Sequence, residues 1–373
     1  MWANRTIHEA MQKTTYEKHV DRSGAMNDVI VEQNDLESGF GDTVRISLLE
    51  QLPDVAYRGQ KLSDKSCKLK YKYEDVKIDC VDLCPVEWET KKTAQLRPND
   101  LRKEAKGKLQ QAKARMMDAT FYSVLAGDTL ANGDPFRDGS NEICAPSKNR
   151  HCIAACGDCE EDIEDDASAL LTLEDVYDLR QLAENHGQCD QDTFRPIMVD
   201  GEEHWKLFMH PFVVRALKKD PCWKEVQLAA MAGGDIKNNP MFSGALGVWE
   251  RVIFVESSKM PYGITKDGCN YLENVHRSVL AGAGAVNTAY AGVKGAKGEW
   301  LEDENKLDKC RKIALSCYMG MKKSRFAPED ACQHGKFNER ECDDYATLVF
   351  SSQGCKPKPS NKGEKTAPVK KGA

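Results

Sequence analysis

Four cysteines and one histidine lie in a short stretch of the chain and could bind a metal. Cys152, Cys156 and Cys159 follow a C-x3-C-x2-C spacing, and Cys144 and His151 come shortly before them. Three thiolates at this spacing can hold three irons of a four-iron cluster and leave the fourth iron open, as in radical S-adenosylmethionine enzymes. The same side chains could instead hold a structural zinc ion, because zinc accepts thiolates and imidazoles at varied spacings.

Neither kind of metal site has the sequence context that it requires. The triplet lies mid-chain in an acidic segment without strand–helix repetition, and its single C-x2-C lacks a second pair at the conventional distance. The chain has 15 cysteines, an odd number that cannot pair completely within one molecule. We therefore expect mostly free thiols, no metal and no cofactor, and leave open whether these four cysteines bind zinc or form disulfides.

Motifs of the common enzyme classes are missing from the sequence. It contains neither a G-x-S-x-G nucleophile turn nor an H-E-x-x-H zinc motif, and its eight histidines are scattered. Gly282-Ala-Gly284 lacks the third glycine of a dinucleotide-binding loop. We expect no catalytic residues and no nucleotide site.

The composition is that of a globular protein with two or three domains. The 373 residues are 40% hydrophobic and 30% charged, and a chain of this size buries roughly three quarters of its unfolded surface. A net charge of −6 argues against a surface that binds nucleic acid over its whole extent. Because no apolar run reaches signal-peptide or membrane-spanning length, we expect neither secretion nor membrane insertion.

Alternating hydrophobicity predicts two extended regions in the first quarter of the chain. Val44, Ile46 and Leu48 alternate with polar residues, which is typical of a half-buried strand. Residues 58–81 alternate on both sides of Glu74-Asp75 and predict a two-stranded ribbon. An isolated ribbon is marginally stable in water, so it must lie on this subunit or on another. Residues 1 to about 40 show no sustained period and predict an arm rather than a core element.

Helical patterns follow. Residues 99–126 predict a helix of about 28 residues, roughly 40 Å long, with one apolar face. Thr172 and Asp175 form a capping box that begins a second helix, which we expect to end at Gly187, and Pro211 begins a third. The face of the first helix opposite its apolar stripe is predicted to be solvated, in preference to contacting phosphates, and carries Arg102, Lys103, Lys106, Lys108, Lys113 and Arg115.

The remaining elements complete a mixed α+β order rather than a regular βαβ alternation. Residues 128–169 predict a long loop or insertion, and residues 273–292, rich in alanine and glycine, predict a helix. The last 18 residues hold six lysines and one glutamate, a charge of +5. Further strands are predicted at 197–199, 205–209, 249–257 and 345–350.

Four stretches carry a family resemblance: residues 41–52, the ribbon leading into Val76-Lys-Ile-Asp, residues 101–127, and His210–Pro221 with the Asn239-Pro-Met-Phe-Ser-Gly-Ala-Leu-Gly-Val-Trp block. In this order and spacing they resemble the N-four-like major capsid proteins of tailed double-stranded-DNA bacteriophages, over roughly residues 30–350. The sequence departs from the family in its cysteine-rich acidic insertion and in its basic tail.

The resemblance implies the Hong-Kong-97-type coat fold, an α+β fold with an N-terminal arm, an extended hairpin loop, a peripheral domain with a long spine helix, and an axial domain. The expected boundaries are 1–45 for the arm, 46–84 for the hairpin loop, 85–130 for the peripheral domain with the spine helix, 131–168 for the insertion, 169–300 for the axial domain, 301–355 for the peripheral return strands, and 356–373 for the basic tail.

The resemblance also implies a function without enzymatic activity. We expect a major capsid protein that self-assembles into pentamers and hexamers, forms an icosahedral head in the cytoplasm of a host bacterium, and encloses double-stranded DNA without sequence preference. Its other expected partners are portal, scaffold and decoration proteins. We expect no contact with a membrane. The alternatives are an encapsulin-like shell of a cellular nanocompartment and, in another class, a metalloenzyme built on the cysteines at 144–159.

Overall fold

The computed structural model of the 373-residue chain describes most of the sequence, in segments. Residues 1–13 of the predicted arm, residues 239–246 of the Asn-Pro-Met-Phe block and the basic tail after Lys356 lie outside the described residues. The described residues are 14–21, 27–36, 41–49, 58, 69–89, 101–131, 134–136, 141–189, 194–199, 201–225, 247–291, 299–305, 310–328 and 343–356.

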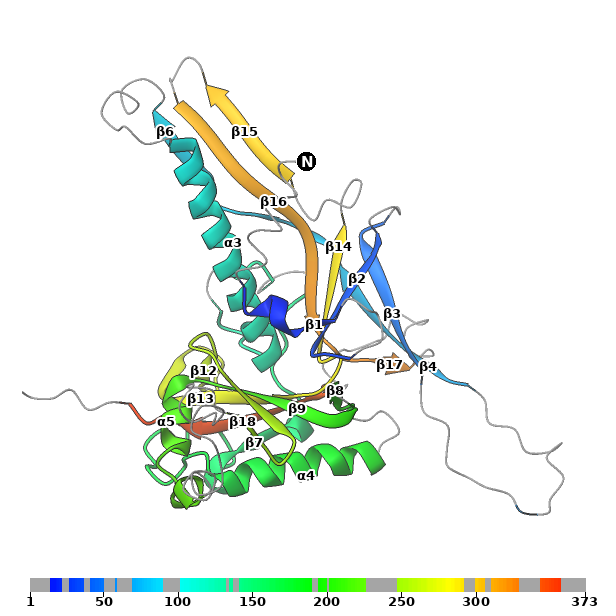
Figure 1. Cartoon of the computed structure of the whole chain (residues 1–373), viewed down its shortest axis with the longest axis vertical. Coiled ribbons are helices and arrows are strands. Elements are labelled where there is room, and N and C mark those ends of the chain that lie inside the picture. The colour runs from blue at the N-terminus through cyan, green and yellow to red at the C-terminus, as the bar shows by residue number, and fades with distance from the viewer. Residues whose placement is uncertain are drawn as a thin grey trace, which may run out of the picture.

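Two sheets and one long helix make up the body of the molecule (Figure 1). Within the described ranges, the first sheet has seven strands in the order β1-β2-β14-β16-β15, with β5 and β6 also paired to β16. Its strands are β1 (Val20–Asp21), β2 (Ile30–Leu36), β5 (Asp79–Asp82), β6 (Val86–Glu89), β14 (Val286–Ala291), β15 (Glu299–Asn305) and β16 (Cys310–Lys323).

The second sheet lies at the C-terminal end of helix α3 (Leu101–Ala126) and has eight strands among the described residues. Their order is β10-β11-β9-β13-β18-β7, with β12 on β13 and β8 on β9. Helix α4 (Leu173–Cys189) packs on the face away from α3 (Figure 1). The strands are β7 (His151–Ile153), β8 (Ile197–Val199), β9 (Glu202–Met209), β10 (Val248–Trp249), β11 (Val252–Glu256), β12 (Tyr262–Ile264), β13 (Tyr271–Ala281) and β18 (Thr347–Gln353).

Helix α3 confirms the long helix that the sequence predicts, but not the whole of its predicted polar face. Leu109, Lys113 and Met117 lie one turn apart on the face that packs against the seven-stranded sheet, and Lys113 is only 1% exposed. The prediction of a solvated Lys113 is therefore wrong; its aliphatic stem is long enough to lie among apolar side chains. Arg102 is exposed, as predicted, and forms an ion pair with Glu302 of β15 at 2.7 Å.

The predicted helix at 273–292 is instead the strand pair β13 and β14. Both strands are buried on both faces for most of their length. Apolar and small residues therefore occupy every position, and the alternation of apolar and polar residues that identifies a half-buried strand is lost. Gly282 and Gly284 belong to the connection between these strands. A Cβ on Gly282 would collide with the carbonyl oxygen of Arg195, and Gly284 has a φ of 74°.

Three other boundaries differ from the predictions. Part of the predicted arm lies in the core, because β2 pairs in parallel with β14. The predicted strand at 249–257 is the hairpin β10–β11, whose turn residues Glu250 and Arg251 have φ of 49° and 66°. Helix α4 continues past Gly187 to Cys189.

Several predictions are confirmed. Asp175 N donates to Thr172 Oγ1 at 3.3 Å, and Thr172 N donates to an Asp175 carboxylate oxygen at 2.8 Å, which is the predicted capping box. Helix α5 (Pro211–Leu217) begins at the predicted proline, and β8, β9 and β18 lie where strands are predicted. Among the helices of the described ranges, none is long and apolar enough to cross a membrane.

Two glycines of α3 provide a matched pair of stability tests. A Cβ added at Gly107, inside the helix, would meet nothing within 4 Å, whereas Gly127 follows the last turn at a φ of 70°. We expect Gly107→Ala to raise the free energy of unfolding by about 0.5–1 kcal/mol through helix propensity. Gly127→Ala is expected to lower it by at least about 1–2 kcal/mol, because alanine disfavours the left-handed conformation and its Cβ would lie 2.7 Å from the Cys144 carbonyl oxygen. Denaturant unfolding of both variants checks the opposite signs.

Candidate assembly site

A hairpin projects from the body on the side away from α3 (Figure 1). It consists of β3 (Thr43–Leu49) and β4 (Tyr71–Lys77), paired antiparallel from Thr43 opposite Lys77 to Leu49 opposite Tyr71. The two strands therefore differ from the predicted ribbon, in which Glu74-Asp75 separates the strands; β4 runs straight through this pair. A short strand, β17 (Ala327–Pro328), pairs with β4 on its other edge.

The two sides of the hairpin have different chemistry. Val44, Ile46 and Val76 face inward and are buried, as the alternation in 43–48 predicts. On the outer side Arg45 donates two hydrogen bonds to Asp75, at 2.7 and 2.8 Å. Toward the far end three apolar residues of this side are exposed: Leu49 is 50% exposed, Leu69 58% and Tyr71 40%. Lys70, between the last two, is exposed as well.

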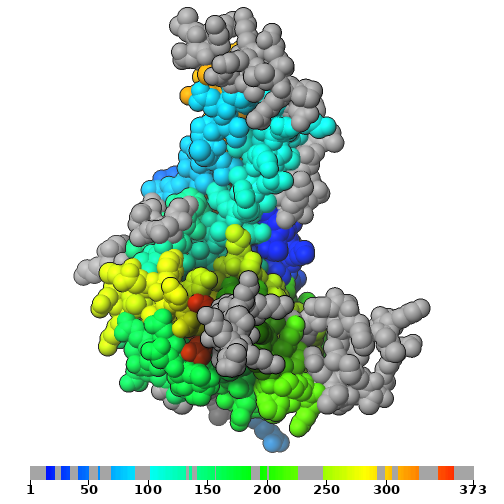
Figure 2. All heavy atoms as spheres, turned by 90° about the vertical axis from the view of Figure 1, so that its left-hand side faces the viewer, coloured from blue at the N-terminus to red at the C-terminus, as the bar shows by residue number. Residues whose placement is uncertain are grey.

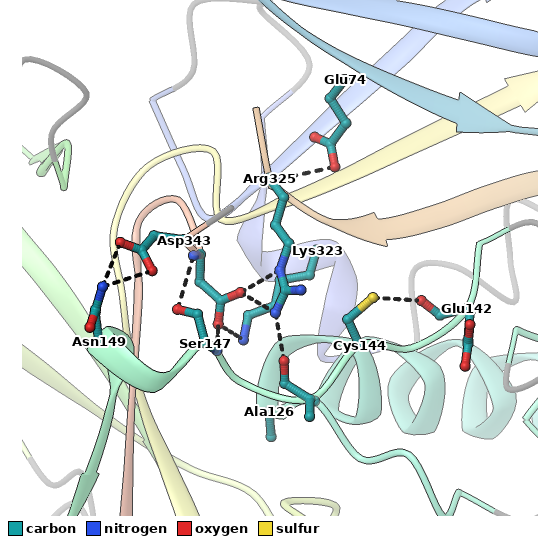
Figure 3. A network of polar contacts seen from close by, with 12 residues as sticks. Glu74, Ala126, Glu142, Cys144, Ser147, Asn149, Lys323, Arg325 and Asp343 are labelled. Atoms are coloured by element: carbon teal, nitrogen blue, oxygen red, sulfur yellow. Dashed lines mark hydrogen bonds and ion pairs between the residues drawn. The ribbon is translucent and has the colours of Figure 1, made fainter. Parts of the chain in front are cut away.

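A buried carboxylate fixes the base of the hairpin. Glu74 lies opposite Ile46 and is 3% exposed. Its oxygens accept hydrogen bonds from Asn287 Nδ2 at 2.6 Å and from the backbone nitrogen of Arg325 at 3.1 Å. Figure 3 shows the contact with Arg325. Asn287 belongs to β14, so Glu74 joins the hairpin to the central strands of the seven-stranded sheet.

A second buried carboxylate lies beside the first. Asp344 is 1% exposed and accepts from Lys323 Nζ at 2.5 Å and from Arg325 Nε at 2.7 Å. Ser147 Oγ in turn accepts from the Asp344 backbone nitrogen at 3.2 Å. Burial alone would raise the pKa of Asp344, but the charges of Lys323 and Arg325 outweigh it and hold that pKa below its usual value.

A pocket of about 630 Å³ opens next to this network. Its wall includes the segment 142–149 together with Thr129, Arg325 and Asp343. Asn149 Nδ2 donates to both oxygens of Asp343, at 3.3 and 3.1 Å, and the Cys144 thiol donates to the Glu142 carbonyl at 3.5 Å (Figure 3). The pocket wall thus combines hydrogen-bonded polar groups with the apolar side chains of Ile143, Ala145 and Pro146.

The cysteines of the first motif are spread over several elements. Cys144 lines the pocket, Cys152 lies in β7, and Cys156 ends a short 3-10 turn. Cys152 and Cys159 are free thiols. Burial raises the pKa of the Cys152 thiol, which disfavours the thiolate that metals bind. His151 donates or accepts a 2.9 Å hydrogen bond with Ser351. No three His, Cys, Asp or Glu side chains are close enough to hold a metal ion in the part of the chain that the structure describes.

The residues of this network were not predicted from the sequence. Glu74 occupies the same inward parity as Val76, and a carboxylate at an inward position of a strand is the one signal that indicates it. Its partner Arg325 lies 251 positions away, and no local pattern connects the two. Asp344 likewise sits directly before a predicted strand without any motif around it.

The comparison with known families decides the identity of the chain. A family model described as phage capsid protein matches residues 1–349. The chain belongs to this family. No curated protein sequence matches it. The capsid protein is therefore a structural shell subunit and not an enzyme, it associates with copies of itself, and its place is the virion capsid.

Solved structures confirm the fold. The capsid of Ralstonia phage GP4 is 21% identical, with 93% of each chain covered and a TM-score of 0.74. The cyanophage Pam1 capsid is 17% identical, covering 92% of this chain and 93% of that one, with a TM-score of 0.68. The capsid of Helicobacter pylori bacteriophage KHP30 is 15% identical, with 91% and 92% covered and a TM-score of 0.64. The capsid protein has the predicted Hong-Kong-97-type α+β fold, while the N-four-like subgroup stays a prediction.

The Asp344 cluster gives the capsid protein an expected dependence on pH. Asp344→Asn leaves two cations buried without a countercharge and is expected to cost about 3–5 kcal/mol of unfolding free energy at pH 7. A carboxyl with a lowered folded pKa stabilises fully above the unfolded value of about 3.9, and this stabilisation is lost as the pH falls toward the folded pKa.

Denaturant unfolding between pH 7 and pH 3 checks both points. Asp343→Asn is the matched control, because Asp343 is the exposed neighbour of Asp344. The difference between the parental chain and Asp344→Asn should shrink below about pH 4. An Asp344→Asn protein as stable as Asp343→Asn at pH 7 would contradict the role given to this carboxylate.

Proposed function

We propose that the capsid protein assembles into rings of five and six subunits that close into an icosahedral head around the double-stranded DNA of a tailed phage. The membership of the family and the fold support this proposal. Heterologous contacts that repeat around a ring close it at a fixed number of subunits, and each contact can be modest because every subunit makes many.

The observation that carries the proposal is the contrast between the two ends of the β3–β4 hairpin. Its base is tied into the core through Glu74, whereas Leu49, Leu69 and Tyr71 near its far end are exposed and apolar. Exposed apolar side chains that lie together at the end of a strand pair mark a contact surface. The hairpin therefore lies on a neighbouring subunit in the assembled shell.

The two sheets correspond to the two domains of the coat fold in this proposal. The seven-stranded sheet with α3 forms the peripheral domain, and the eight-stranded sheet with α4 and α5 forms the axial domain. The boundaries at 169–300 and 301–355 need two changes, because β18 lies in the eight-stranded sheet between β13 and β7, whereas β14 lies in the seven-stranded sheet between β2 and β16. Of the predicted insertion 131–168, β7 joins the same sheet.

The remaining partners follow from charge and redox chemistry. A net charge of −6 limits contact with packaged DNA to local, sequence-independent attraction. Free thiols among the described residues include Cys152, Cys159 and Cys317, which suits assembly in the reducing cytoplasm of a host bacterium. A portal, a scaffold and decoration proteins complete the head in this proposal.

Replacing the apolar end of the hairpin tests the proposed contact. A triple variant with Leu49→Ser, Leu69→Ser and Tyr71→Ser is expected to change the free energy of unfolding of the subunit by less than about 0.5 kcal/mol per site, because these side chains are exposed. Assembly should be lost or strongly weakened, because the apolar contact with the neighbour is removed. Sedimentation velocity of the parental and variant chains measures the assembled fraction.

Ser47→Ala is the matched control, since Ser47 lies on the exposed side of β3 and carries no apolar surface. It should assemble like the parental chain. A triple variant that forms the same amount of shells as this control would contradict the placement of the hairpin on a neighbouring subunit.

A further inference from the structure

The C-terminal end of α3 rests on the eight-stranded sheet, and an arginine of that sheet reaches it. Gly127 in the left-handed conformation lets the backbone nitrogen of Asp128 donate back to the Ser123 carbonyl at 2.8 Å, which closes the helix. Arg277 Nη1 donates to the Gly127 carbonyl oxygen at 2.8 Å. A cation at this position also interacts favourably with the negative end of the helix dipole.

A carboxylate on the other side holds this arginine in place. Glu160 accepts from Arg277 Nε at 2.7 Å and from Nη2 at 2.8 Å, the two-pronged arrangement that fixes a guanidinium in direction as well as position. Both residues are 5% exposed. Arg277 lies on β13, which pairs with β9 on one edge and β18 on the other.

Glu160 collects further groups from the same sheet. It accepts from the backbone nitrogen of Ile264 at 2.7 Å and from Ser351 Oγ at 2.5 Å, and His151 Nε2 lies 3.4 Å away. Burial alone would raise the pKa of Glu160, but hydrogen bonds from Arg277 and His151 hold it far below the usual value. Glu160, which lies in the predicted insertion 131–168, is thus a buried, charged residue with several hydrogen-bond donors around it.

We propose that Arg277 and Glu160 are positioning residues for assembly, which set the angle between α3 and the eight-stranded sheet. The inference rests on the proposed shell function. Figure 2 shows α3 running down the molecule onto the part that contains this sheet. The helix has 26 residues and is about 39 Å long, so a rotation of about 10° about its C-terminal end, where Arg277 binds, displaces its far end by about 7 Å. A displacement of that size breaks a contact between the far end of the helix and a neighbouring subunit.

One other directional contact joins β13 to the end of α3: Tyr271 Oη donates to both carboxylate oxygens of Asp128, at 3.0 and 3.1 Å, but Asp128 lies just after the helix. The remaining contacts at the junction do not fix this angle in the same way. Phe121 of α3 packs against Phe208 of β9 with ring centroids 5.8 Å apart, but apolar packing is not directional. Lys206 Nζ and Asp28 Oδ1 lie 2.5 Å apart and also join the two sheets, through the chain before β2 rather than through α3. Arg277, held by Glu160, instead donates a hydrogen bond to the backbone at the end of the helix.

The experiment compares particles formed by full-length Glu160→Gln and Arg277→Lys with those of the parental chain. Glu161→Gln is the matched control, because Glu161 is the exposed next residue of the same segment. Circular dichroism and a melting temperature establish that each subunit folds, and electron cryomicroscopy measures particle diameters. We expect the fraction of particles with the parental diameter to fall at least about fivefold in both variants, and to stay unchanged in Glu161→Gln.

Uniform shells of parental diameter from the two variants would overturn the proposal, even if their melting temperatures are lower. Loss of a pair that only stabilises the fold lowers the melting temperature and leaves the shell diameter unchanged. Loss of folding in both variants would also overturn it, since the pair would then act in folding alone. If the parental chain forms no shells, the proposed function fails separately. Amide hydrogen exchange at residues 123–128 then tests the contact of Arg277 with the end of α3. We expect faster exchange there in Glu160→Gln than in Glu161→Gln.

Discussion

Three buried carboxylates hold the parts of this capsid protein in register. Glu74 joins the projecting hairpin to β14, Asp344 joins the end of β16 to the start of β18, and Glu160 joins four strands of the second sheet to the end of α3. A buried charge is tolerated only when opposite charges and hydrogen-bond donors surround it, and each of these has them. The partners of Glu74 and Glu160 lie far away in the sequence, whereas Lys323 and Arg325 lie only 21 and 19 positions from Asp344.

The strongly periodic elements were predictable from the sequence, and the networks were not. Residues 101–119 and 43–49 have one buried and one exposed side, which leaves a clear pattern, and the Thr172–Asp175 capping box locates the start of α4. β13 and β14 are buried on both sides, so their alanines and glycines imitate a helix. The partners of the buried carboxylates are 117 to 251 positions away in the cases of Arg277–Glu160 and Arg325–Glu74, beyond any local pattern.

The same arrangement explains how one subunit can serve a shell. The body is stiffened by paired charges at its junctions, which are directional, while the hairpin extends from it with an exposed apolar end. Contacts between copies of a rigid body repeat with the same geometry, and repetition closes a ring. The cysteines that could suggest a metal centre instead lie apart on the pocket wall, on β7 and in the turn that follows it.

The central claim is that the capsid protein is a shell subunit whose hairpin rests on its neighbour. An electron cryomicroscopy reconstruction of particles purified with the full-length chain tests it most directly. The account predicts a closed shell of five- and six-membered rings in which β3 and β4 of each subunit lie over the adjacent subunit. A hairpin folded back on its own subunit in such a shell, or a chain that stays monomeric under all conditions of assembly, would contradict it.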